Sequence, residues 1–177
     1  ERLGHAEQRR AVGAEVTWTG GVGEVPPAVK AVALAAAFDA VVRRHEALRT
    51  TFAQHEGEPF QVIRLPGPWL LPVMDLAPLA DISQEERVRQ CAAKEAAVPF
   101  DLARGPLLRS SLLRLGPEDH VLLITMHHII SDAWSMEVLL RELCALYTAF
   151  RGGTPSPLPD LPLQYVDFAR WQRQWLQ

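Results

Sequence analysis

The sequence has 177 residues, of which 48% are hydrophobic and 22% charged, and its formal net charge is −3. These values are typical of a soluble globular protein, and the length fits one domain with a sizeable core. A slightly acidic chain offers no electrostatic footprint for nucleic acid or for an anionic membrane. No apolar stretch approaches the roughly 20 residues that span a bilayer, and the charged N-terminus lacks a signal-peptide core. We therefore expect a cytoplasmic protein without a nucleic-acid or membrane partner.

The first quarter of the chain predicts a strand followed by a helix. Residues 1–11 are polar and weakly patterned, whereas apolar residues alternate over 12–19, as in a strand with one buried face. The glycine-rich stretch 20–23 predicts a loop, and Pro26-Pro27 can begin a helix. Residues 28–47 are rich in alanine and predict a helix packed closely on a sheet.

The middle of the chain predicts a hairpin, a long connection and a second helix. Gly57 marks the turn of an antiparallel hairpin over 48–65. Four prolines between 66 and 79 indicate an extended surface connection. The run Ser83-Gln84-Glu85-Glu86 is a capping box that predicts a helix to about residue 97. A loop at 99–102 follows.

The last third predicts a second hairpin and two more helices. Strands at 107–115 and 121–126 flank a turn, and the apolar spacing over 134–150 predicts a helix of about four turns. A proline-rich segment over 154–162 then leads to a helix over 164–176. Four aromatic residues on one face of that last helix favour core packing: Tyr165, Phe168, Trp171 and Trp175. We predict a mixed α/β fold with a largely antiparallel sheet packed with helices, in one domain over 1–177.

The two cysteines, Cys91 and Cys144, fall in predicted helices and form no close motif. Free, mostly packed thiols in a reducing compartment are favoured over a disulfide.

One short stretch, 126–135, brings several chemically active side chains together directly after an uncharged strand. If the strand continues through His128, then His127 and His128 point to opposite faces, so one imidazole can face a cavity while the other turns into the fold. Three interpretations stay open: two hydrogen-bonded structural imidazoles, a metal site, or acid–base chemistry. The metal site is disfavoured because the usual ligand spacings and a third ligand are missing.

Asp132 stands where the helix over 134–150 begins. It can be a simple N-cap, or a buried carboxylate that pairs with an arginine and shapes the histidine loop. The charge-dense run 43–52 offers Arg44 and Arg49 as structural ion-pair candidates, since a guanidinium suits a buried pair.

These segments resemble the N-terminal half of a nonribosomal peptide synthetase condensation domain, a family that shares the chloramphenicol acetyltransferase-like fold. The match is carried by four ordered stretches: His127 to Ala133 against His-His-x-x-x-Asp-Gly, 44–52, Pro99 to Leu102 with Gly105 to Arg109, and 165–172. Ala133 replaces the glycine of the first of these. The resemblance implies strain there if that position needs a positive φ. The family's first motif is faint in 6–10.

The resemblance implies amide-bond formation between aminoacyl or peptidyl thioesters, each held on the 4'-phosphopantetheine of a donor or acceptor carrier protein. The resemblance implies that no cofactor or metal is bound directly. His128 would face the reaction tunnel, His127 would be the inward partner, and Asp132 would be structural. The opposing wall would come from the C-terminal half of the domain, so this half alone would be incomplete. Two other functions stay open: a non-catalytic docking module for carrier proteins, or an acyltransferase that completes its site by self-association.

Overall fold

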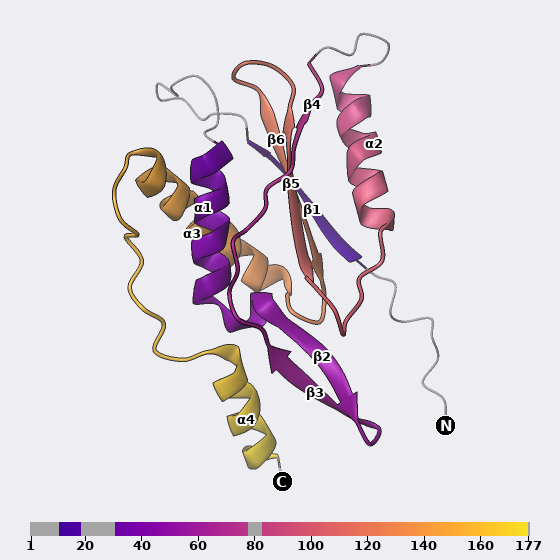
Figure 1. Cartoon of the computed structure of the whole chain (residues 1–177), viewed down its shortest axis with the longest axis vertical. Coiled ribbons are helices and arrows are strands. Elements are labelled where there is room, and N and C mark those ends of the chain that lie inside the picture. The colour runs from indigo at the N-terminus through magenta and orange to yellow at the C-terminus, as the bar shows by residue number, and fades with distance from the viewer. Residues whose placement is uncertain (1–10, 19–30, 78–82, 177) are drawn as a thin grey trace. The chain divides into compact units, whose positions relative to one another are not determined.

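The computed structural model describes residues 11–18, 31–77 and 83–176, which fall into two compact units. The first unit contains 11–18, the greater part of 71–100, and 108–129. The second contains 32–70, 101–107 and 130–176. Figure 1 labels their helices and strands. The predictions for 1–10, 19–30 and 78–82 lie outside the described residues, and the single domain predicted for the chain stays a prediction.

The first unit is built on a four-stranded sheet with the order β1-β6-β5-β4. β1 (Ala11–Trp18) and β5 (Leu108–Arg114) each pair antiparallel with β6 (His120–His127). The predicted strand at 12–19 and the second predicted hairpin are therefore confirmed. β4 (Val73–Asp75) pairs parallel with β5, within the segment predicted to be an extended surface connection. A strand of three residues among prolines is too short to produce an alternating pattern.

One helix, α2 (Gln84–Ala97), covers a face of this sheet against β1 and β6. The Ser83 hydroxyl accepts the backbone N–H of Glu86, as the capping-box prediction requires. The apolar cluster of this face contains Leu76, Val88, Leu113, Val121 and Leu123. On β5 and β6 these are odd-numbered positions, so Arg109 and His127 belong to the same face by the alternation of a strand.

The second unit begins with α1 (Ala31–Arg44), which the short 3-10 helix η2 (Glu46–Arg49) follows. The helix predicted to reach residue 47 ends three residues earlier, because His45 has extended backbone angles of φ −104° and ψ 107°. β2 (Thr50–His55) and β3 (Glu58–Ile63) then form the predicted hairpin. Both turn residues have positive φ, 50° at Glu56 and 88° at Gly57, as a tight two-residue hairpin turn requires.

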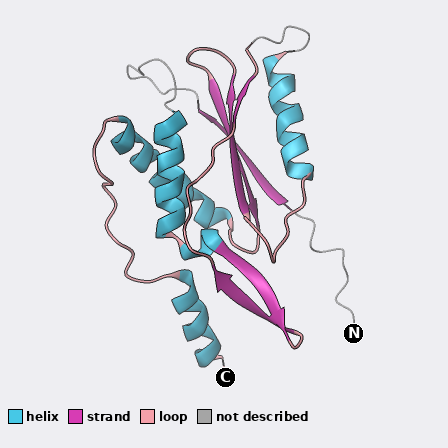
Figure 2. Cartoon of the chain, in the orientation of Figure 1, coloured by secondary structure: helices cyan, strands magenta, loops and turns pink. Residues whose placement is uncertain are grey.

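Two further helices complete the second unit, α3 (Ala133–Arg151) and α4 (Tyr165–Trp175), joined by an extended segment (Figure 2). α3 ends at Gly152 and Gly153, the latter at φ 73°, a left-handed conformation that glycine adopts at no steric cost. Both predicted helices are confirmed. Within the described residues, no helix has the length and apolarity needed to cross a bilayer.

The aromatic face of α4 is exposed, so the prediction that it packs in the core is wrong. Its four aromatic side chains are between 49% and 73% exposed. Their rings instead contact one another in sequence, with centroid separations of 5.9 to 6.1 Å from Tyr165 to Trp175. Helical spacing gathers aromatic residues on one side, but burial depends on another element to cover them. We define these four residues as the aromatic stripe of α4.

Candidate active site

The two histidines stand at the end of a central strand. His127 is the last residue of β6 and is half-buried, whereas His128 lies in the turn that follows and is exposed. The strand predicted over 121–126 thus reaches His127 but does not continue through His128, because the chain turns there. His128 therefore owes its exposure to the turn and not to strand alternation.

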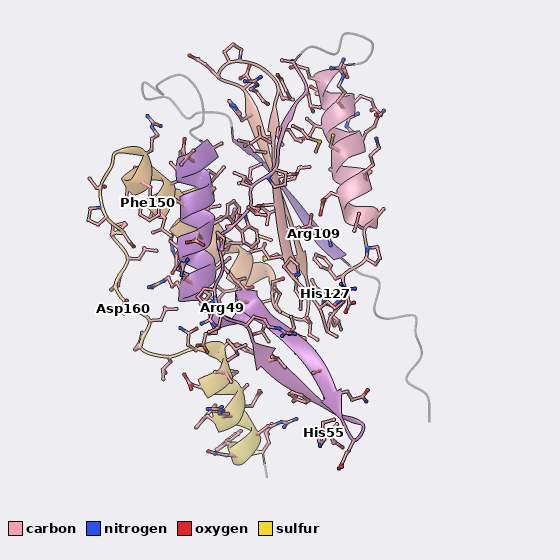
Figure 3. The ribbon with its side chains drawn as sticks, viewed as in Figure 1. Arg49, His55, Arg109, His127, Phe150 and Asp160 are labelled. Atoms are coloured by element: carbon pink, nitrogen blue, oxygen red, sulfur yellow. The ribbon has the colours of Figure 1, made fainter. Side chains whose placement is uncertain are left out.

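The His127 ring, which Figure 3 labels below Arg109, contacts Ile129 and Phe100 within the first unit. Its Nδ1 accepts the backbone N–H of Ile129 at 3.0 Å. Its ring meets the Phe100 ring edge to face, with centroids 5.8 Å apart and an interplanar angle of 86°. An Nδ1 that accepts has no proton, so the neutral ring carries its proton on Nε2. The hydrogen bond from the Ile129 N–H to His127 joins the residues on either side of His128.

Arg109 lies directly behind Phe100. Its guanidinium carbon is 3.9 Å from the Phe100 ring centroid, a cation–π contact. Its Nε donates to the Glu95 carboxylate at 2.5 Å, and its Nη2 donates to the carbonyls of Glu95 and Val98. Sequence reasoning did not assign Phe100 and Arg109 to the site. The signal was present, because both belong to the third stretch of resemblance.

Asp132 is the N-cap of α3, as the simpler of the two predictions has it. Its Oδ1 accepts the Ser135 N–H at 2.7 Å, and the Ser135 Oγ accepts the Asp132 N–H at 2.6 Å. Together these bonds form a capping box. The residue is exposed, so the expected buried carboxylate is not observed. The Asp132 carboxylate accepts one free N–H at the helix end and the Ser135 hydroxyl accepts another, and neither bond requires burial.

The two arginines considered as partners of Asp132 contact other carboxylates. The Arg44 Nε donates to the buried Glu142 of α3 at 3.1 Å, and Nη1 donates to the Pro159 carbonyl. The Arg49 Nη2 donates to Glu46 at 3.2 Å, and its Nη1 donates to the carbonyl of Arg64. Both guanidinium groups thus bond within the second unit, where they connect elements of the scaffold.

Ala133 is the first residue of α3, and its φ is not positive. The strain considered at this position is therefore absent, since a helical backbone suits alanine.

A cavity of about 270 Å³ lies in the second unit, against η2 and the first turns of α3. Its polar lining comes from His45, Asp132 and Ser135, and Leu48, Val138 and Trp134 contribute to its apolar wall. Among the described residues, no group of three or more His, Cys, Asp or Glu side chains could hold a metal ion. Cys144 is exposed and not packed as predicted, and partial desolvation raises the pKa of its thiol.

The condensation-domain family matches residues 19–177, nearly nine tenths of the chain. The chain belongs to this family. Among curated relatives, one polypeptide of the linear gramicidin synthase from Brevibacillus parabrevis is 49% identical over 141 residues. The match covers 80% of this chain but 3% of that polypeptide. The predicted resemblance to nonribosomal peptide synthetase condensation domains is thus confirmed.

Solved condensation-type structures share the fold. The X-domain from teicoplanin biosynthesis is 31% identical with a TM-score of 0.78, and the match covers 94% of this chain and 33% of that one. The starter condensation domain of rhizomide synthetase gives a TM-score of 0.75 at 22% identity, over 85% of this chain and 36% of that one. The chain therefore spans about a third of these solved chains and a few per cent of the gramicidin synthase polypeptide.

Proposed function

We propose that this chain supplies the histidine-bearing half of an amide-bond-forming condensation domain. The observation that carries the proposal is the turn after β6, where His128 is exposed while the His127 ring is held by Phe100 and the Ile129 N–H. Neutral imidazole is the side chain best suited to accept a proton near pH 7.

In the proposed reaction, an acceptor amine attacks the carbonyl of a donor thioester. The new C–N bond forms first and gives a tetrahedral intermediate, whose collapse breaks the C–S bond. The departing thiolate finally takes up the proton that the amine loses. His128 accepts that proton or holds the amine through the tetrahedral intermediate. A thioester is already activated, so the protein needs mainly to align two groups and to manage one proton. Asp132 and the Arg44–Glu142 pair support the scaffold without contacting substrate.

The proposed partners are carrier proteins, whose 4'-phosphopantetheine arms deliver both substrates. The chain itself binds no cofactor in this proposal. The opposing wall of the reaction site comes from a second half of the domain. Two observations support such a half: the matched solved chains are about three times as long, and the aromatic stripe of α4 is exposed.

A second candidate function is a docking module without catalysis. One finding favours it, namely that the teicoplanin X-domain, 31% identical to this chain, is known in a complex with OxyB. A condensation-type fold can thus serve protein recognition. In that case the histidines are structural groups.

The deciding experiment measures condensation between aminoacyl thioesters loaded on donor and acceptor carriers. The assay compares this chain alone with a two-half domain that has this chain as its first part. We expect product only with both halves, and a loss of at least a hundredfold in His128→Ala, the size of a general acid–base contribution. Binding of carriers without product in the two-half domain would favour the docking module.

The matched control is His55→Ala, which removes an exposed histidine at the tip of the β2–β3 hairpin (Figure 3). We expect the turnover of this variant to equal that of the parent. Parent-level turnover in His128→Ala would remove His128 from its proposed role.

A further inference from the structure

A continuous row of side chains connects α2 to the histidine turn within the first unit. The Glu95 carboxylate on α2 bonds Arg109 on β5, and the Arg109 guanidinium lies on one side of the Phe100 ring. Phe100 in turn contacts His127 edge to face. The row lies on the α2-facing side of the sheet, where the apolar cluster occupies the other end.

The Arg109 guanidinium is fixed on several sides. Three of its bonds run to Glu95 and Val98, which end α2 or follow it. β5 fixes its backbone, because Arg109 pairs with Thr125 in the ladder with β6. A planar guanidinium with several donors fits this arrangement. A lysine ammonium could not make the hydrogen bonds to Glu95 and Val98 and also stack on the Phe100 ring. The face of Phe100 is thereby held in one orientation.

The His127 ring transmits this orientation to the turn. Its Nδ1 accepts the Ile129 N–H, and this bond spans His128, which lies between the two residues in sequence. A rotated ring would lose the bond and free the backbone on both sides of His128. A ring held against Phe100 keeps Nδ1 aimed at the turn and leaves the tautomer with its proton on Nε2.

We propose that Phe100 and Arg109 are positioning residues for His128, acting through the His127 ring and the Ile129 N–H. This inference rests on the proposed function in that His128 is the group whose placement matters. Neither residue contacts the substrate. The purpose of the row is to hold one tautomer and one ring angle at His127, which apolar packing alone does not select.

The test uses the 177-residue chain with ¹⁵N-labelled histidine and a labelled backbone. In the parent, the His127 nitrogens should show the tautomer with its proton on Nε2, and the Ile129 amide should exchange slowly with solvent. In Phe100→Leu and Arg109→Lys we expect the nitrogen resonances to move toward those of a freely exchanging imidazole. We expect Ile129 exchange to accelerate roughly fivefold, as the loss of one net hydrogen bond gives.

Two controls separate positioning from folding. Arg114→Lys is the same type of substitution at the other end of β5, where Arg114 bonds Asp75. It should leave the His127 signals unchanged. Phe100→Tyr keeps the ring and should preserve the parent spectrum. If Phe100→Leu unfolds the chain, Arg109→Lys carries the test, because it alters no apolar volume at the ring.

Unchanged His127 tautomer and Ile129 exchange in a folded Arg109→Lys variant would overturn the proposal. The outcome is independent of the condensation assay. A changed His127 tautomer in Arg109→Lys, together with full turnover in His128→Ala, would support the role of Phe100 and Arg109 in holding the His127 ring. It would refute the proposed chemistry of His128 instead.

Discussion

The Nε2 of His45 lies 2.7 Å from a carboxylate oxygen of Glu142, although 97 residues separate the two in sequence. The same oxygen accepts the Nε of Arg44 at 3.1 Å, and the Glu142 side chain is 10% exposed. One buried carboxylate on α3 thus bonds both Arg44, the last residue of α1, and His45, the residue that follows it. The Gln164 side chain adds to this junction, since its Nε2 donates to the Arg44 carbonyl and its Oε1 accepts the Glu46 N–H.

Removal of this carboxylate should destabilise the second unit. Glu142→Ala leaves the Arg44 guanidinium and the His45 ring without their shared acceptor, and we expect a loss of about 2–3 kcal/mol in the free energy of unfolding. Glu142→Gln, which keeps the volume and one acceptor, should lose less. Denaturant unfolding measures both. Glu137→Ala removes an exposed carboxylate from the same helix and should change little.

Loss of the α3 cap should affect stability more than chemistry. Asp132→Ala removes the acceptor of the Ser135 N–H, which costs about 1 kcal/mol for a helix N-cap. Asp132→Asn keeps that acceptor and should remain near the parent. The melting temperature of the chain and turnover in the two-half domain are the measurements. Asp160→Ala, in the exposed segment before α4, is the matched control. A drop in turnover as large as that in His128→Ala would show that Asp132 does more than cap.

Gly105 should not tolerate a side chain. Its φ is +61°, and a Cβ built there would lie 2.9 Å from the Thr51 Cγ2. We expect Gly105→Ala to destabilise the chain by about 2–3 kcal/mol, from the left-handed backbone and the overlap together. Thr51→Ser removes the overlapping methyl, so the double variant should recover part of the loss relative to Thr51→Ser alone. Gly67→Ala meets nothing within 4 Å and should be neutral in the same unfolding assay.

Asp75 should contribute to stability in a pH-dependent way. The Arg114 side chain and the Ala77 N–H both donate to Asp75, and they hold the pKa of its carboxyl below its ordinary value. A depressed pKa in the folded state gives stability that is present above the unfolded pKa and is lost as the pH falls through the folded pKa. The difference in unfolding free energy between the parent and Asp75→Asn should therefore shrink on acidification below about pH 4. The effect will be small, because the pair is exposed. A difference that stays constant down to about pH 2 would contradict it.

Local patterns in the sequence were sufficient for most of the elements and for the family. Three of the patterns depend only on neighbours within one helical turn or one strand, so they can be read without tertiary context. They are the alternation over 12–19, the capping box at Ser83 and the apolar spacing over 134–150. The ordered stretches around 44–52, 99–109, 127–133 and 165–172 then identified the condensation family. The N-cap at Asp132 was likewise a local matter, because the Ser135 N–H that it accepts is three residues away.

Tertiary structure alone decided which side chains meet. The exposure of the α4 stripe, the pairing of β4 with β5, and the choice of Glu142 as the acceptor of Arg44 all depend on elements distant in the sequence. The same holds for the contact of Phe100 with His127, which joins two stretches that the sequence presents separately. A periodic pattern shows that a face is apolar or that a charge needs a partner. The partner itself is chosen only when the chain folds and the desolvation of each group is balanced by a neighbour that the fold brings to it.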